Sequence, residues 1–138
     1  MTRRVVAFAV LVAICLTSTL AIGQVKQGKT RPIKTKQLMK GLVAANCGAI
    51  GEGLKTSPAD DAAWDDLALK AALLNEASYL LMDDGRCPDA AWADADKTLR
   101  EASASLLAKL EAKDLAGAQE AFKTMTQSCG ACHKAHRK

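Results

Sequence analysis

Apolar residues recur every three or four positions along most of the chain, the spacing that places them on one face of an α-helix. Four such stripes predict helices over residues 32–54, 57–84, 88–112 and from 114 to the C-terminus. Helices of about 20 to 25 residues joined by short connections form antiparallel bundles. The predicted fold is therefore all-α, an up-down-up-down four-helix bundle. The clearest stripes are Trp64, Leu67, Ala71, Leu74, Ser78 and Leu81 in the second helix and Trp92, Ala95, Leu99, Ala102 and Leu106 in the third.

Helix starts are marked by prolines and small acids. Each of the three prolines stands near a predicted start and none stands inside a helix, as expected because proline is tolerated only in the first turn. Ser57, followed by Pro58, is the predicted N-cap of the second helix, and Asp114 is the predicted N-cap of the fourth.

The first 23 residues have the pattern of a secretory signal peptide. Arg3 and Arg4 precede an apolar run over residues 5–16, and small residues lead to Gly23. The run is too short for the roughly 20 residues that span a bilayer, so we expect removal of residues 1–23 and no membrane attachment of the mature chain. A basic, flexible leader (24–31) and the helical domain (32–138) follow. The expected location is the periplasm.

Composition narrows the class of protein. With 49% hydrophobic and 25% charged residues the chain is too apolar for a disordered protein. A net charge of +4, with 4% aromatic residues, gives little support to nucleic-acid binding.

The chemistry is concentrated near the C-terminus, in Cys129-Gly130-Ala131-Cys132-His133. C-x-x-C-H is the attachment pattern of c-type haem: two thiols add to the porphyrin vinyl groups, and the histidine binds iron. A thioredoxin-like pair expects a βαβ context, and a zinc site needs two further ligands. A structural disulfide explains neither the histidine nor its position. One covalent haem is the predicted cofactor.

With this motif and four Ala-rich helices, the chain resembles the class II c-type cytochromes, namely cytochrome c′ and its cytochrome c556-type relatives. Arg137 occupies the place of a basic residue that the family usually carries four positions after the ligand histidine. Lys36-Gln37 is a near match to an Arg-Gln pair early in the first helix. The resemblance implies a periplasmic four-helix haem protein with an electron-transfer or gas-binding role.

An up-down bundle brings the end of the fourth helix beside the start of the first, the end of the second and the start of the third. The haem pocket is therefore expected to draw on Met39, Leu42, Tyr79, Met82 and Trp92. Trp64 falls at the opposite end, in the core.

The second axial ligand stays open. His136 is three residues after His133 on the same helix, so it cannot easily reach the opposite face of a haem. In cytochrome c556-type members a methionine of the first helix is the ligand, which makes Met39 the candidate here. Met39 falls one residue before the matching place, which holds Lys40. A five-coordinate iron shielded by Met39 or Leu42 is the alternative.

Two functions follow from these alternatives. A methionine-ligated iron indicates a one-electron carrier, our leading hypothesis, and an open iron indicates a binding module for nitric oxide or carbon monoxide. No acid–base pair for peroxide cleavage is evident, so we do not expect an enzyme. Bases are concentrated in residues 24–40 and near the C-terminus. A basic surface around a haem edge would steer an acidic redox partner protein, and a solvated surface with a flexible basic leader is the alternative.

Two structural questions also stay open from the sequence. One is the oligomeric state: related bundles often form homodimers, but the first two helices here show no clear exposed apolar stripe that would force a dimer. The other is a Cys47–Cys87 disulfide. Oxidising compartments favour pairing, but the two residues lie about 20 Å apart along the bundle unless the loop between the second and third helices folds back.

Overall fold

The computed structural model describes residues 27–137, so the predicted signal peptide (1–23) and the start of the predicted leader lie outside the described residues. Within this range the regular structure is helical, apart from an isolated antiparallel bridge between Gln27 and Lys34. The all-α prediction is confirmed. The first helix consists of α2 (Thr35–Leu38), a π-helical segment η1 (Met39–Ala44) and α3 (Ala45–Gly53), and it is followed by α4 (Asp61–Met82), α5 (Ala90–Glu111) and α6 (Leu115–His136).

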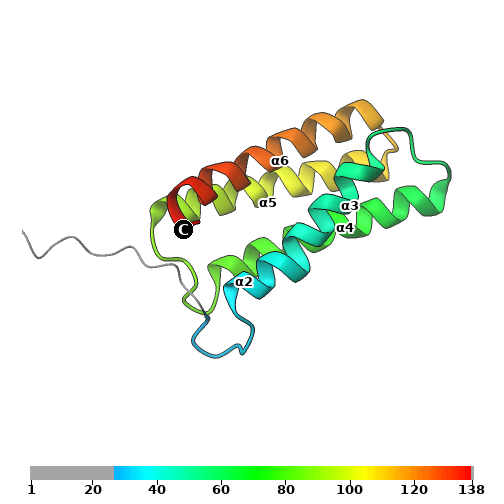
Figure 1. Cartoon of the computed structure of the whole chain (residues 1–138). Helices are drawn as coiled ribbons and strands as arrows, with labels where there is room; N and C mark the ends of the chain where they lie inside the picture. The colour runs from blue at the N-terminus through cyan, green and yellow to red at the C-terminus, as the bar shows by residue number, and fades with distance from the viewer. Residues whose placement is uncertain (1–26, 138) are drawn as a thin grey trace, which may run out of the picture.

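Each helix packs against the next one along the chain, so α3 contacts α4, α4 contacts α5 and α5 contacts α6. Figure 1 shows α5 and α6 running side by side in opposite directions. The last helix also contacts the end of the first helix, where Gln119 Nε2 donates a hydrogen bond to the carbonyl of Leu54 at 2.8 Å. This arrangement is that of the predicted up-down bundle. No helix within residues 27–137 is both long enough and apolar enough to cross a membrane.

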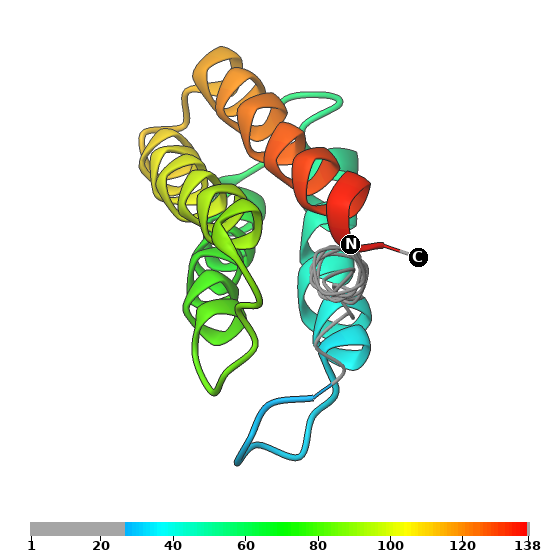
Figure 2. The same ribbon diagram turned by 90° about the vertical axis from the view of Figure 1, so that its left-hand side faces the viewer.

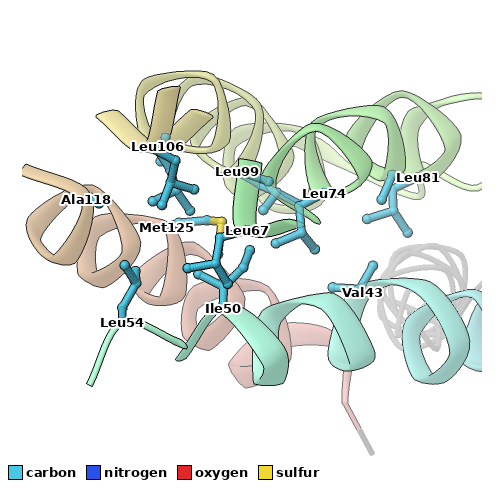
Figure 3. Packing of buried hydrophobic residues seen from close by; sticks show 14 of the residues in the cluster. Val43, Ile50, Leu54, Leu67, Leu74, Leu81, Leu99, Leu106, Ala118 and Met125 are labelled. Carbon is cyan, nitrogen blue, oxygen red and sulfur yellow. The ribbon is translucent and has the colours of Figure 1, made fainter. Parts of the chain in front are cut away.

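The hydrophobic core runs between the helices (Figure 3). Ile50, Leu74, Leu106 and Met125 come from four different helices and are almost completely buried. The predicted stripes of the second and third helices are buried at every position. Burial of side chains of this size stabilises a fold by about 1.5–3 kcal/mol each, so the four stripes hold the bundle together.

Aspartates cap the three long helices. The Oδ1 atoms of Asp60, Asp89 and Asp114 accept hydrogen bonds from backbone amides three residues ahead, at 2.8, 2.9 and 2.9 Å. The prediction that Asp114 is the N-cap of the last helix is confirmed, whereas the prediction that Ser57 is the N-cap of α4 is wrong. Residues 57–60 are not helical, and α4 begins after Asp60, whose extended backbone aims its carboxylate at the first turn.

The first helix is locally widened. Residues 39–44 adopt the π-helical pattern, and Asn46 Nδ2 donates to the carbonyl of Leu42, inside that segment, at 2.7 Å. Single π turns within α-helices are rare and are frequent at functional sites. This one includes both Met39 and Leu42.

Residues 27–34, the N-terminal segment, are tied to the turn between α4 and α5. Asp84 in this turn accepts hydrogen bonds at Oδ1 from Thr30 N (2.7 Å) and Thr30 Oγ1 (2.7 Å), and at Oδ2 from Arg31 N (3.0 Å). Its own carbonyl accepts from Lys29 N at 2.8 Å. Part of the predicted basic leader is therefore held against the bundle.

The same turn contains an ion pair that is closed to solvent. Arg86 is completely buried, with Nη1 3.6 Å from Asp84 Oδ2 and Nη2 donating to the carbonyl of Ile33 at 3.0 Å. Desolvation alone would raise the pKa of Asp84, but hydrogen bonds from Arg31 and Thr30, together with the charge of Arg86, outweigh it and lower this pKa to about 2. The Asp84 carboxylate thus stays ionised while it holds the N-terminal segment.

Candidate functional site

The C-x-x-C-H motif occupies the last two turns of α6. These turns lie at the end of the bundle that also contains the start of α2 and the turn between α4 and α5 (Figures 1 and 2). We call this end the motif end. Cys129 and Cys132 are half-buried, and both thiols are free. His133 is exposed, one turn after Cys129 and next to Cys132. The motif therefore straddles the boundary between the core and the solvent.

Their surroundings keep both thiols protonated at neutral pH. Desolvation raises the pKa of Cys129, and desolvation together with Cys129, Asp96 and Asp89 raises the pKa of Cys132 to about 11. A reactive redox dithiol needs the opposite shift, which helix N-termini and nearby cations provide. This motif lies at a helix C-terminus, where the helix dipole disfavours a thiolate. The geometry thus argues against a thioredoxin-like pair.

The other cysteines do not form an alternative site. All four cysteines in residues 27–137 are free, so the Cys47–Cys87 disulfide is not formed. Cys47, on α3, faces α6 instead. Burial, followed by the proximity of Cys129, raises its pKa. Among the described residues no group of three or more His, Cys, Asp or Glu side chains could hold a metal ion, so the zinc alternative has no support there.

Most of the residues predicted around the motif lie at this end. Met39, Leu42 and Met82 are half-buried and pack against the core. Trp92 is buried, and its Nε1 donates to the carbonyl of Leu81 at 3.0 Å. At the outer edge of the same end, Arg137 is exposed.

Tyr79, which was also expected near the haem, is at the surface of the bundle. Its side chain is 50% exposed and lies under the guanidinium of Arg100, with Arg100 Cζ 4.1 Å from the ring centroid. The reason is the helix phase: Ser78 and Leu81 take the inward positions on either side of Tyr79, which turns the ring towards α5.

Two polar residues whose burial the sequence analysis did not predict lie at the motif end. His136 packs edge-on against Trp92 with ring centroids 5.3 Å apart, and its Nε2 lies 3.4 Å from Asp89 Oδ1. Asp96 is 4% exposed on the inner face of α5. The signal for Asp96 is visible in the sequence, since it falls at helical spacing between Trp92 and Leu99. His136 gave no comparable signal because it lies in the last helical turn.

Buried polar atoms without a hydrogen-bond partner also occur at this end. Within the described chain they include Thr35 Oγ1, Arg86 Nε and Asp96 Oδ1. Folded proteins rarely leave such atoms unpaired, and here they come from α2, the α4–α5 turn and α5. Two half-buried thiols, a neighbouring exposed histidine and partly covered apolar side chains supply the donors and the surroundings that a covalent haem requires.

Comparison of the chain with protein-family models, with curated proteins and with solved structures gave no match.

Proposed function

We propose that the chain is an exported c-type haem protein that carries one electron at a time. Cys129 and Cys132 form thioether bonds with the two vinyl groups, and His133 binds the iron. Bound haem supplies an iron that cycles between the ferric and ferrous states. The single observation that carries the proposal is the placement of the complete C-x-x-C-H motif at the edge of the core, beside apolar residues that the protein only partly covers.

The surrounding residues have distinct roles in this proposal. Met39, in the widened first helix, is the candidate second axial ligand, and a thioether ligand raises the reduction potential. Leu42, Met82 and Trp92 exclude water from the group. Arg137 extends the positive surface next to the motif.

Basic side chains around the motif support a protein partner of opposite charge. Five exposed bases come from the start of the first helix and from the end of α6, which lie at the same end of the bundle (Figure 1): Lys34, Lys36, Lys40, Lys134 and Arg137. Such a surface speeds the approach of an acidic redox protein. We therefore propose an acidic electron-transfer partner in the periplasm.

Covalent attachment is the first test. The full chain is produced in a periplasm that contains haem-maturation machinery, and covalently bound haem is measured after denaturation. We expect haem in the wild-type protein and in Cys47→Ser and Cys87→Ser, which change cysteines outside the motif. Cys129→Ser and Cys132→Ser each lose one thioether bond, and the double variant binds no haem covalently. Wild-type protein without covalent haem would contradict the proposal.

Spectra of the same protein distinguish the two functions. An electron carrier gives a sharp low-spin ferrous spectrum that carbon monoxide does not change, because Met39 occupies the second axial position. Met39→Ala then opens the iron to carbon monoxide, whereas Met82→Ala, which changes the other half-buried methionine at the motif end, does not. A wild-type ferrous iron that is high-spin and binds carbon monoxide would instead favour the gas-binding function.

A further inference from the structure

Asp96 is a buried carboxylate with too few partners. It lies in the second turn of α5 and is 4% exposed. Its Oδ2 accepts a hydrogen bond from Arg100 Nη2 at 3.2 Å, whereas Oδ1 is buried without a partner. Burial raises the pKa of Asp96 to about 6, against the opposing effect of Arg100. The carboxyl group therefore changes its charge close to neutral pH.

Arg100, the only cation paired with Asp96 within residues 27–137, is shared with α4. Its Nε donates to Ser78 Oγ at 3.0 Å, and its guanidinium stacks on the ring of Tyr79. The Arg100 side chain is also 33% exposed, so solvent screens its charge. Arg100 thus interacts with α4 and with solvent as well as with Asp96, which weakens its stabilisation of the ionised carboxylate.

Asp96 also lies near the motif. From α6, the Cys132 thiol is close enough for the charge of Asp96 to raise its pKa. His136 is the other titratable group that α6 buries at this interface, and it pairs with Asp89. Asp89 differs from Asp96, since its Oδ1 also accepts a hydrogen bond from Trp92 N. Asp96 is therefore the carboxylate beside the motif that lacks a full set of partners.

We propose that Asp96 is a redox-linked proton site: it takes up one proton when the haem attached at Cys132 gains one electron, and it releases that proton when the electron leaves. The inference rests on the proposed function. The electron comes from the redox partner, and the proton comes from solvent, which reaches the partly exposed Arg100 side chain next to Asp96. Charge therefore balances in each direction.

The physical reason is the low dielectric of the motif end. An added electron makes the surroundings of Asp96 more negative, which favours its protonated form. The coupling is reciprocal, so a protonated Asp96 favours the reduced haem. Each tenfold change in proton concentration then shifts the reduction potential by up to about 59 mV for one electron.

The test is the reduction potential of the haem-loaded protein, measured between about pH 4.5 and 8. This range covers the titration of the buried Asp96 carboxyl. We expect the wild-type potential to fall as pH rises and the potential of Asp96→Asn to be nearly independent of pH. Asp94→Asn is the matched control, because Asp94 lies on the exposed face of the same helix; it keeps the wild-type dependence. A pH-independent wild-type potential, or an unchanged dependence in Asp96→Asn, would overturn the inference.

A second readout does not need the variant to fold. Reduced-minus-oxidised infrared spectra of protein with isotope-labelled aspartate should show a protonated carboxyl group appearing on reduction. Absence of that band would contradict the assignment of Asp96 as the redox-linked proton site. The two proposals fail in different ways: without covalent haem the proposed function fails, whereas haem with a potential that ignores pH defeats only the proton site.

Discussion

Asp96 links the stability of the fold to pH. Its carboxylate is on the apolar face of α5, and its pKa of about 6 is above the value of roughly 3.9 for an exposed aspartate. Between these two values the folded state binds more protons than the unfolded state, so stability falls as pH rises through this window. The change approaches roughly 2–3 kcal/mol over the whole window.

We therefore predict that the free energy of unfolding decreases between pH 4 and pH 7 in the wild type and that Asp96→Asn removes most of this decrease. Urea denaturation at several pH values measures it. Asp94→Asn serves again as the control and should follow the wild type. If the free energy of unfolding depends on pH in the same way for the wild type and Asp96→Asn, Asp96 is ionised to the same extent in the folded and unfolded states.

Asp84 changes the stability of the fold in a more acidic range and with the opposite sign. Because the pKa of Asp84 is lowered to about 2 in the folded protein, its ionised carboxylate stabilises the fold above the pKa of the unfolded state. This contribution is lost as pH falls towards 2. Asp84→Asn tolerates the positive φ of 60° but replaces one acceptor oxygen with a donor. We predict faster hydrogen exchange at the amides of Thr30 and Arg31 in this variant.

The control for this prediction is Asp83→Asn. The exposed Asp83 side chain pairs with that of Arg31 and with no backbone amide among residues 27–137, so its removal should leave the amides of Thr30 and Arg31 protected. Equal exchange rates in wild type and Asp84→Asn would contradict a role of Asp84 in holding the N-terminal segment.

At the scale of single elements, the N-cap of α4 can be tested directly, because the sequence predicted Ser57 and the structure has Asp60. Asp60→Ala removes the side chain that caps Ala63 N, and such a change costs about 1 kcal/mol. Ser57→Ala should leave stability nearly unchanged, because Ser57 precedes the helix by several residues. Urea denaturation of both variants compares the two positions directly. A larger loss for Ser57→Ala would restore Ser57 as the cap.

Helix existence and inward faces were predictable because the stripes of α4 and α5 repeat without interruption. The π-helical segment was not, since the amino acids of residues 39–44 give no local signal for a widened turn. The position of the C-x-x-C-H motif on the last helix was also predictable. Which of His133 and His136 is buried was not, because both lie in the final turns, where few side chains define an inward face.

Contacts between distant segments were the least predictable part. Thr30 and Asp84 are 54 positions apart, and nothing in the basic composition of residues 24–31 indicates a specific acidic partner. Arg86 likewise reads as an ordinary loop residue in the sequence, yet it is completely buried. Both contacts depend on how the first helix enters the bundle, which helical periodicity does not determine.

At the scale of the whole molecule, the motif end is less completely packed than the core around Ile50, Leu74, Leu106 and Met125. Those four side chains are almost completely buried, whereas the motif end contains half-buried thiols and methionines together with buried polar atoms that lack a hydrogen-bond partner. A group bound there should stabilise that end more than the other, because a ligand that binds only the folded state stabilises the contacts around it.

We predict that haem attachment slows amide hydrogen exchange in α2, in η1, in residues 83–89 and in the last turns of α6, with little change around Trp64. The comparison is between wild-type protein with haem and the variant that lacks both Cys129 and Cys132. Uniform protection throughout the bundle would indicate that the motif end is no less stable than the rest before haem binds.

The attachment of the N-terminal segment also determines which substitutions position 28 accepts. A Cβ atom at Gly28 would collide with the Asp84 carboxylate and lie 2.9 Å from Arg86 Cζ. Both side chains are almost completely buried. Adding one methyl group there should therefore release the segment as effectively as removing the carboxylate does. In a scan of random mutations, an inconspicuous glycine in a basic leader would rank with a buried ion pair among the least tolerant positions.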